Sequence, residues 1–174
     1  MTESDQATPP QPALHHVAFA CRDLDETHAF YGEVLGLELV HTEVAQGPDG
    51  YFRHVFYDLG DGSALAFFDL HGVGEPDPLR TAISEDLGLP LWVNHLALRT
   101  DADRQAALVA RLADAGHEPV MDIDHGWCHS VYFRDPNGIV VELCRDTPGM
   151  PIDPQRADEL RVEPVEVGGW GHKR

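Results

Sequence analysis

The pattern of apolar and polar residues along the chain repeats one plan twice. An apolar stretch that starts at Leu14 predicts a β-strand, and apolar residues spaced by four after it, such as Phe30 with Val34, predict a helix. The second half repeats this order with the stretch "VNHLALR" and a helical stripe that contains Leu108 and Leu112. Three shorter strand-like stretches follow each helix, so each half reads as βαβββ.

The predicted helix limits also agree between the halves. Asp23 with Glu26 three residues later suits the start of the first helix, and Thr100 with Asp103 suits the start of the second. Gly36 and Gly116 are placed to end them. The distance from His16 to Gly36 is 20 residues and that from His95 to Gly116 is 21. This agreement indicates an internal duplication.

The duplication predicts an α+β fold of two tandem βαβββ modules. We assign residues 1–12 to a disordered tail, 13–70 to the first module, 71–92 to a linker, 93–147 to the second module and 148–174 to a C-terminal extension. The linker has room for a short helix within residues 79–87. Turn residues in "LGDGS" and "DPNG" separate the last two strands of each module. Laying these segments over one another aligns His54 with His129 and Tyr57 with Tyr132.

Composition narrows the class of protein. The formal net charge of -18 disfavours binding to nucleic acids and to anionic membrane surfaces. No apolar run approaches the roughly 20 residues that span a bilayer, and the first residues lack the pattern of a signal peptide, so we expect a soluble cytoplasmic protein. The three cysteines show no CxxC spacing, which makes a disulfide framework or a thiolate zinc site improbable and reduced thiols the expectation.

The duplication places His16 and His95 at equivalent points of the first strand in each module. Glu142 lies in the otherwise apolar stretch "GIVVEL", where an unpaired buried carboxylate would be costly. Two imidazoles and one carboxylate form a facial triad that leaves coordination positions open. We therefore predict a divalent metal bound by His16, His95 and Glu142. The alternative is that Glu142 lies on a solvated face or pairs with Arg99 or Arg134.

The segments "HHVAF", "NHLAL" and "DPNGIVVEL", within the duplicated plan, resemble the vicinal oxygen chelate superfamily over about residues 13–147. This superfamily includes glyoxalase I, fosfomycin-resistance enzymes, bleomycin-binding proteins and type I extradiol dioxygenases. The resemblance implies paired modules that form a U-shaped mixed sheet around a metal cavity, and a homodimer. It maps the metal positions onto His16, His95, Glu142 and either Ala66 or Phe67, of which the last pair cannot ligate.

The spacing from Ile123 to Glu142 resembles the motif of extradiol dioxygenases. That resemblance implies that His125 steers dioxygen and moves a proton, and that Tyr132 bonds a substrate oxygen. Candidate substrate-binding residues around them are Trp127, His129 and His54, although each is also a plausible core or surface residue, as His125 is a plausible loop residue. The chain departs from the motif in two respects. It has Asp61 where these enzymes carry a further histidine, and two modules where many have four.

We therefore predict an extradiol-type dioxygenase that uses Fe(II) and dioxygen to cleave a catechol-like small molecule. The runner-up is an isomerase, a lyase or a thiol transferase on the same scaffold, with Mn(II), Zn(II) or Ni(II). A small-molecule-binding resistance protein without catalytic activity is the third hypothesis. No nucleic-acid or membrane partner is expected.

Overall fold

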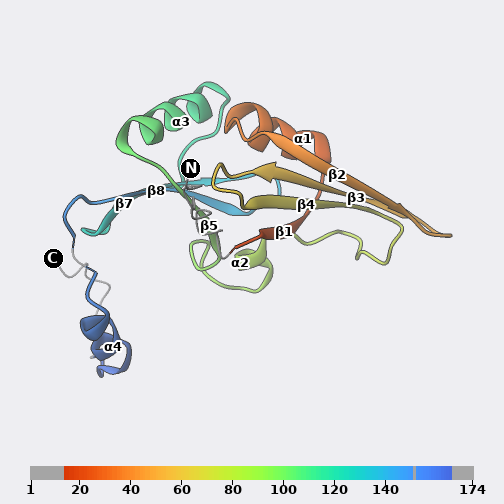
Figure 1. The fold of residues 1–174 in the computed structure, drawn as a ribbon. Coiled ribbons are helices and arrows are strands. Elements are labelled where there is room, and N and C mark those ends of the chain that lie inside the picture. Colours follow the sequence, from red (N-terminus) through yellow and green to blue (C-terminus); the bar gives the residue numbers. More distant parts are fainter. Residues whose placement is uncertain (1–13, 151, 166–174) are drawn as a thin grey trace, which may run out of the picture.

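A computed structural model describes residues 14–150 and 152–165 of the chain (Figure 1). The predicted tail therefore lies outside the described residues. Residues 151 and 166–174 of the predicted C-terminal extension lie outside them as well. The first module comprises strand β1 (His16–Cys21), helix α1 (Leu24–His28), its continuation as a π-helix η1 (Ala29–Val34), and strands β2 (Leu39–Gln46), β3 (Tyr51–Asp58) and β4 (Ala64–His71).

The second module repeats this order. It comprises β5 (His95–Arg99), α3 (Ala102–Asp114), β6 (Met121–Asp124), β7 (Cys128–Arg134) and β8 (Val140–Asp146). A short helix, α2 (Ile83–Asp86), lies between the modules within the range expected from sequence, and α4 (Pro154–Val162) follows the second. None of the helices in the described ranges is long and apolar enough to cross a membrane.

Each module forms its own four-stranded mixed sheet. The strand orders are β1-β4-β3-β2 and β5-β8-β7-β6, with β1 parallel to β4, β5 parallel to β8, and the remaining pairs antiparallel. A parallel pair needs a long crossover connection, which the helix and two intervening strands supply. The α+β fold of two tandem βαβββ modules is thus confirmed.

Helices α1 and α3 lie on the same side of the two sheets, with α2 on the other side (Figure 1). A single apolar core lies under these helices and draws on both modules, with Tyr31, Phe67, Leu112 and Phe133 among its buried members. Because side chains alternate along a strand, the neighbouring positions face away from this core. We call this second face of each sheet, on which α1 and α3 do not pack, the uncovered face, although several of its side chains are buried by their neighbours; it carries the polar residues considered below.

The N-cap residue predicted from the sequence is confirmed for α1, whereas for α3 the prediction is wrong by one residue. The Asp23 side chain accepts a hydrogen bond from the backbone N–H of Glu26 at 2.8 Å, which confirms the predicted cap of α1. In α3 the cap is Asp101, which accepts from the N–H of Arg104 at 2.8 Å. Thr100, the predicted cap, instead donates its hydroxyl to a backbone carbonyl of β8.

The strand register shows which positions of the two modules correspond. His16 lies opposite Ala64 in β4, and His95 lies opposite Val140 in β8. Two residues further along β4 and β8, Ala66 and Glu142 therefore occupy equivalent positions. The first module places a methyl group where the second places its carboxylate.

The adjacent strands correct the alignment expected from sequence. Phe56 of β3 lies opposite Ala66, whereas Tyr132 of β7 lies opposite the equivalent Glu142. Tyr132 therefore corresponds to Phe56, and its alignment with Tyr57 is wrong by one residue. The same correction aligns His54 with Ser130. A shift of one residue exchanges the two faces of a strand, so this correction decides which side chains can share a site.

The "DPNG" turn joins the two modules through buried hydrogen bonds. Asn137 is fully buried; its side-chain oxygen accepts from the backbone N–H of Arg22 at 2.8 Å, and its amide donates to the Thr27 hydroxyl at 3.1 Å. Asp135 of the same turn accepts from the Tyr31 hydroxyl at 2.9 Å. Gly138 has a φ of +83°, and a Cβ there would lie 2.6 Å from that of Ala82. The turn is thus built for close approach to the first module.

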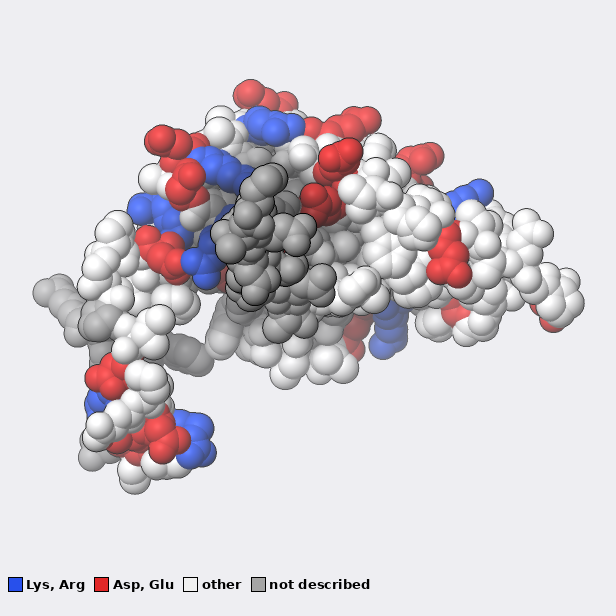
Figure 2. Space-filling model, in the orientation of Figure 1, with Lys and Arg blue, Asp and Glu red and all other residues white. Residues whose placement is uncertain are grey.

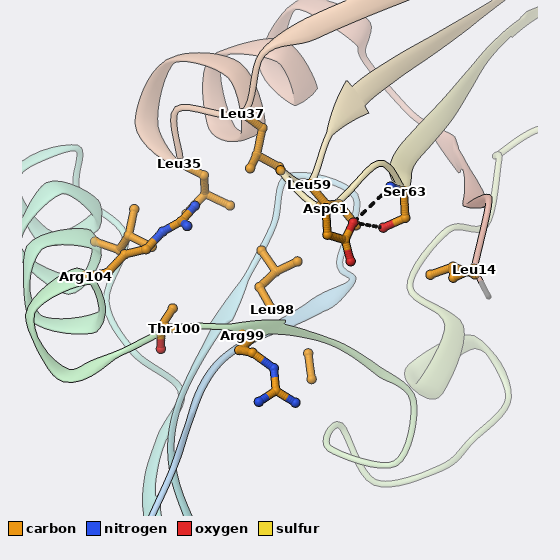
Figure 3. A pocket seen from close by; sticks show the side chains of 13 residues that line it. Leu14, Leu35, Leu37, Leu59, Asp61, Ser63, Leu98, Arg99, Thr100 and Arg104 are labelled. Atoms are coloured by element: carbon orange, nitrogen blue, oxygen red, sulfur yellow. Dashed lines mark hydrogen bonds between the residues drawn. The ribbon is translucent and has the colours of Figure 1, made fainter. Parts of the chain in front are cut away.

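The equivalent junction on the other side of the molecule is open. The turn of the first module faces the start of α3 across a cavity of about 370 Å³ (Figure 3). Asp61, which corresponds to Asn137, turns back and accepts hydrogen bonds from the N–H and the hydroxyl of Ser63 at 2.9 and 2.6 Å. These hydrogen bonds lower the pKa of Asp61. One junction is closed by buried polar contacts, and its counterpart is not.

Replacing Asn137 with Ala should lower the free energy of unfolding by about 3 kcal/mol, because the change leaves buried donors and acceptors of both modules without partners. Urea denaturation would measure this loss. The control is Asp61→Ala at the equivalent, exposed position, which should lower the free energy of unfolding far less because its hydrogen bonds face solvent. Equal losses in the two variants would contradict the proposed role of the turn.

Candidate metal centre and active site

His95 and Glu142 converge on the uncovered face of the second sheet. His95 is the first residue of β5, and Glu142 lies on the parallel neighbour β8. Their Nε2 and Oε2 atoms are 2.9 Å apart, and Glu142 is only 5% exposed. The alternatives weighed for Glu142 do not hold, because Arg99 pairs with Asp146 and Arg134 pairs with Glu85.

The surroundings of His95 suit a metal ligand. The other ring nitrogen, Nδ1, lies 2.9 Å from the backbone oxygen of Trp92, which can only accept a hydrogen bond. Nδ1 therefore carries a proton, and a neutral ring would direct the lone pair of Nε2 at the carboxylate of Glu142. Such a contact requires either a second proton on the ring or a metal ion. A histidine that donates one N–H to a backbone carbonyl is also the usual form of a metal ligand.

Ser130 and Tyr132 complete the polar surroundings of Glu142. The Ser130 hydroxyl donates a hydrogen bond to Oε1 of Glu142, which leaves Oε2 for His95. The Tyr132 hydroxyl lies 3.0 Å from Nε2 of His125. Burial, and after it the charge of Glu142, raises the pKa of Tyr132 to about 12. Tyr132 is therefore protonated near neutral pH, and the tautomer of His125 sets which of the two groups donates in this hydrogen bond.

These residues open onto a cavity of about 560 Å³. His95, His125 and Tyr132 supply its polar groups, and its remaining walls are apolar: Pro90, Trp92, Met121 and Ile123. Its size and its few convergent polar groups suit a small-molecule site. Sequence reasoning missed Trp92, whose closeness to His95 in the chain was the available signal.

Trp127, the tryptophan predicted to line the site, lies next to it. Its ring centroid is 6.4 Å from that of His125, but the side chain is 58% exposed and does not line the cavity just described. His129 lies on the other face of β7, where its ring nitrogens contact Gln105 of α3 at 3.2 Å and Asp122 at 2.9 Å. The structure therefore does not bring His129 together with His95.

His54 and His16 lie on the uncovered face of the first sheet. The His54 ring stacks on Phe68 with centroids 3.7 Å apart, and it is 6.0 Å from the His16 ring. Burial, and after it the His16 ring, lowers the pKa of His54. Its Nε2 atom is buried without a hydrogen-bond partner. His41 and Glu43 of β2 lie on the same face, Glu43 directly opposite His54.

Within one chain, β1 and β5 lie in different sheets, and His16 and His95 lie toward different cavities. Leu14, just before β1, and Arg99, at the end of β5, line one cavity. Phe19, near the end of β1, and His95, at the start of β5, line another. His16 precedes Phe19 by three residues, about 10 Å along a strand. In the part of the chain that the structure describes, His16 belongs to no cluster of three possible metal ligands.

Comparison with known proteins identifies the family. The model of the Glyoxalase/Bleomycin resistance protein/Dioxygenase superfamily matches residues 13–143. The chain belongs to this superfamily. The vicinal oxygen chelate resemblance seen in the sequence is therefore confirmed at the level of the superfamily.

Relatives within the superfamily differ in activity. The chain is 30% identical to 2-epi-5-epi-valiolone epimerase of Actinomyces sp., over 93% of each protein. It is 28% identical to the putative ring-cleaving dioxygenase MhqA of Bacillus subtilis (strain 168), over 68% of this chain but only 36% of that protein. Superfamily membership therefore does not select one reaction for this chain.

A solved superfamily structure illustrates the metal chemistry. The fosfomycin resistance protein FosX of Listeria monocytogenes, determined with Mn(II) and sulfate, superposes with a TM-score of 0.54 at 19% identity, over 78% of this chain and 93% of that one. This likeness concerns the fold. It shows that the fold hosts a divalent metal in another member, and the donor set of His95 and Glu142 fits such an ion.

Proposed function

We propose that the chain is a divalent-metal-dependent enzyme that moves a proton on a small oxygen-bearing substrate, as an epimerase or isomerase does. The observation that carries the proposal is the adjacency of two pairs, His95 with Glu142 at 2.9 Å and His125 with Tyr132 at 3.0 Å, around one cavity. The first pair suits a metal and the second suits proton transfer. The similarity to an epimerase over 93% of both chains supports the same class of reaction.

The proposed metal ligands are His95 and Glu142 of one chain and His16 of a second copy in a homodimer. The separation of His16 from His95 within the chain supports a shared site, because the open face of the first sheet is then free to meet the second sheet of another copy. The outer strands of both sheets, β1, β2, β5 and β6, each have only one neighbouring strand among the described residues. Unpaired strand edges of this kind favour association.

A bound cation would polarise a substrate oxygen and acidify the neighbouring C–H bond. The chain supplies the rest of the reaction. The His125 imidazole takes the proton from one face of the carbon and releases it to solvent, a solvent proton is delivered to the opposite face, and the Tyr132 hydroxyl donates to the oxygen on which negative charge develops. The raised pKa of Tyr132 keeps that donor protonated. Trp92 and Ile123 exclude water from one side of the cavity.

Extradiol ring cleavage with Fe(II) and dioxygen is the second candidate. The apolar walls formed by Trp92, Met121 and Ile123 would suit an aromatic diol, and the similarity to a putative ring-cleaving dioxygenase supports this reading. Against it stands Asp61, which takes the position of a further histidine in ring-cleaving enzymes. Asp61 lines the cavity at the open module junction with Ser63, not the cavity of His95.

One experiment separates these reactions. Protein loaded anaerobically with Mn(II) or Fe(II) is incubated in D₂O with 2-epi-5-epi-valiolone, and deuterium incorporation is followed by NMR. In parallel, the Fe(II) form is tested for oxygen uptake with a panel of catechols. Deuterium incorporation without oxygen uptake is the expected result. Oxygen uptake with a catechol and no exchange would establish the second candidate, and inactivity of every form in both assays would leave a binding protein.

A further inference from the structure

Four polar side chains cluster on the uncovered face of strands β7 and β8. Glu142 and Cys144 alternate along β8 and so point to the same side, and Cys128 and Ser130 do the same along β7. Ser130 lies directly opposite Cys144 in the antiparallel ladder, and Cys128 is one step further along. Two of the three cysteines of the chain are thus brought to one place, although 16 residues separate them in sequence.

The cluster has the dimensions of a metal site. The Sγ atoms of Cys128 and Cys144 and a carboxylate oxygen of Glu142 all lie within 4.8 Å of one another. Two thiolates on one tetrahedral zinc ion, each at about 2.3 Å, are about 3.8 Å apart, so the side chains need to move by little more than about 1 Å. The Ser130 hydroxyl, 3.7 Å from the Cys128 sulfur, lies beside the same point.

We propose that Cys128, Cys144 and Glu142 bind a thiophilic divalent cation such as Zn²⁺ or Cd²⁺. Two sulfur donors and one carboxylate prefer a soft or borderline ion over Mn²⁺ or Mg²⁺. Binding replaces two S–H bonds by two metal–sulfur bonds and releases both protons to the solvent, with no change of oxidation state. The ion reaches the site through Cys144, which is half-buried, whereas Cys128 is 1% exposed.

This site is distinct from the pair that faces His95, yet it shares a ligand with it. Oε2 of Glu142 lies 2.9 Å from His95 Nε2, and Oε1 is directed to Ser130 on the side of the cysteines. A soft cation held by the two thiolates would therefore draw on the carboxylate that the proposed catalytic metal also uses. The activity of the protein should then depend on whether the cysteines are occupied.

The test is an anaerobic titration of the reduced wild-type protein with CdCl₂, followed by the ultraviolet charge-transfer absorbance of cadmium–thiolate bonds. We expect this band to saturate at one Cd²⁺ per chain. The Cys128→Ser/Cys144→Ser double variant should lose it, and each single variant should lose at least half of it. Cys21→Ser is the matched control, because Cys21 is an equally buried thiol whose Sγ contacts the carbonyl of Phe68 in the first sheet.

His95→Ala separates this proposal from the proposed function. That variant removes a ligand of the proposed catalytic metal but none of the thiol site, so the cadmium band should persist with unchanged stoichiometry. No saturable band in the wild type, or a band that survives in the double cysteine variant, would overturn the proposal. Circular dichroism confirms that each variant is folded, and loss of the band in Cys21→Ser would also count against the assignment.

Discussion

The Glu142→Gln variant is expected to keep its fold and to lose bound divalent metal, with an affinity at least about 100-fold below that of the wild type. The amide preserves the shape of the side chain, and its oxygen can still accept from Ser130. It removes the negative charge that offsets the cation beside His95. Metal analysis after dialysis against trace Mn(II), with electron paramagnetic resonance of the bound ion, measures the change.

Asp69→Asn is the control for this variant. Asp69 is 7% exposed, close to the 5% of Glu142, and pairs with Arg53 in the first module at 2.9 Å. Its replacement changes the same charge at a similar depth, but away from the proposed metal, so metal content should stay at the wild-type level. Undiminished metal in Glu142→Gln would contradict the assignment of this carboxylate.

Mixed dimers test whether the third ligand comes from another copy. Homodimers of His16→Ala and of Glu142→Gln should both lack metal. In a heterodimer of the two, one site combines the intact His16 of one chain with the intact Glu142 of the other, and the second site carries both changes. Co-expression with two affinity tags should therefore restore one metal per heterodimer. No restoration would show that the ligands come from a single chain.

Surface charge does not single out this site. The chain has 30 acidic and 12 basic residues, and acidic side chains are spread over the face shown in Figure 2, with basic ones among them. Glu142 is buried and pairs with a histidine, whereas the other buried carboxylates pair with Arg53 (Asp69) or accept from Tyr31 and Asn137 (Asp135). The signal that led to it was a carboxylate in an apolar strand, which composition alone would not reveal.

Local patterns predicted most of the fold because each depends on neighbouring residues. The helix stripes, the Asp23 cap and the terminating glycines follow from period and turn chemistry within a few positions. Duplication then linked His16 with His95, and the apolar stretch around it marked Glu142. The module alignment failed by one residue in β3 and β7, because similar residues at 54 and 57 masked a register that only the strand pairing fixes.

Features created by cross-strand or inter-module contact could not be predicted in this way. Cys128 and Cys144 show no ligand spacing, yet pairing of β7 with β8 brings their sulfurs together. Asn137 read as an ordinary turn residue, but it is buried against α1 of the other module. The position of His16 relative to His95 depends on how modules meet, which hydrophobic periodicity does not encode.

The His125→Ala variant should lower turnover by roughly 100-fold or more, the scale of lost general acid or base catalysis, while metal content remains at the wild-type level. Tyr132→Phe removes the hydroxyl that lies 3.0 Å from His125 and should also reduce kcat without releasing metal. Turnover of the proposed epimerisation, with metal content measured on the same samples, checks both expectations.

His129→Ala is the matched histidine control, because His129 lies on the face of β7 opposite to Tyr132, bonded to Gln105 and Asp122. Its turnover should stay within a few-fold of the wild type. With a pKa of about 12, the Tyr132 hydroxyl does not itself form a limb of the pH profile in the neutral range. Wild-type turnover in His125→Ala or in Tyr132→Phe would remove these residues from the proposed proton transfer.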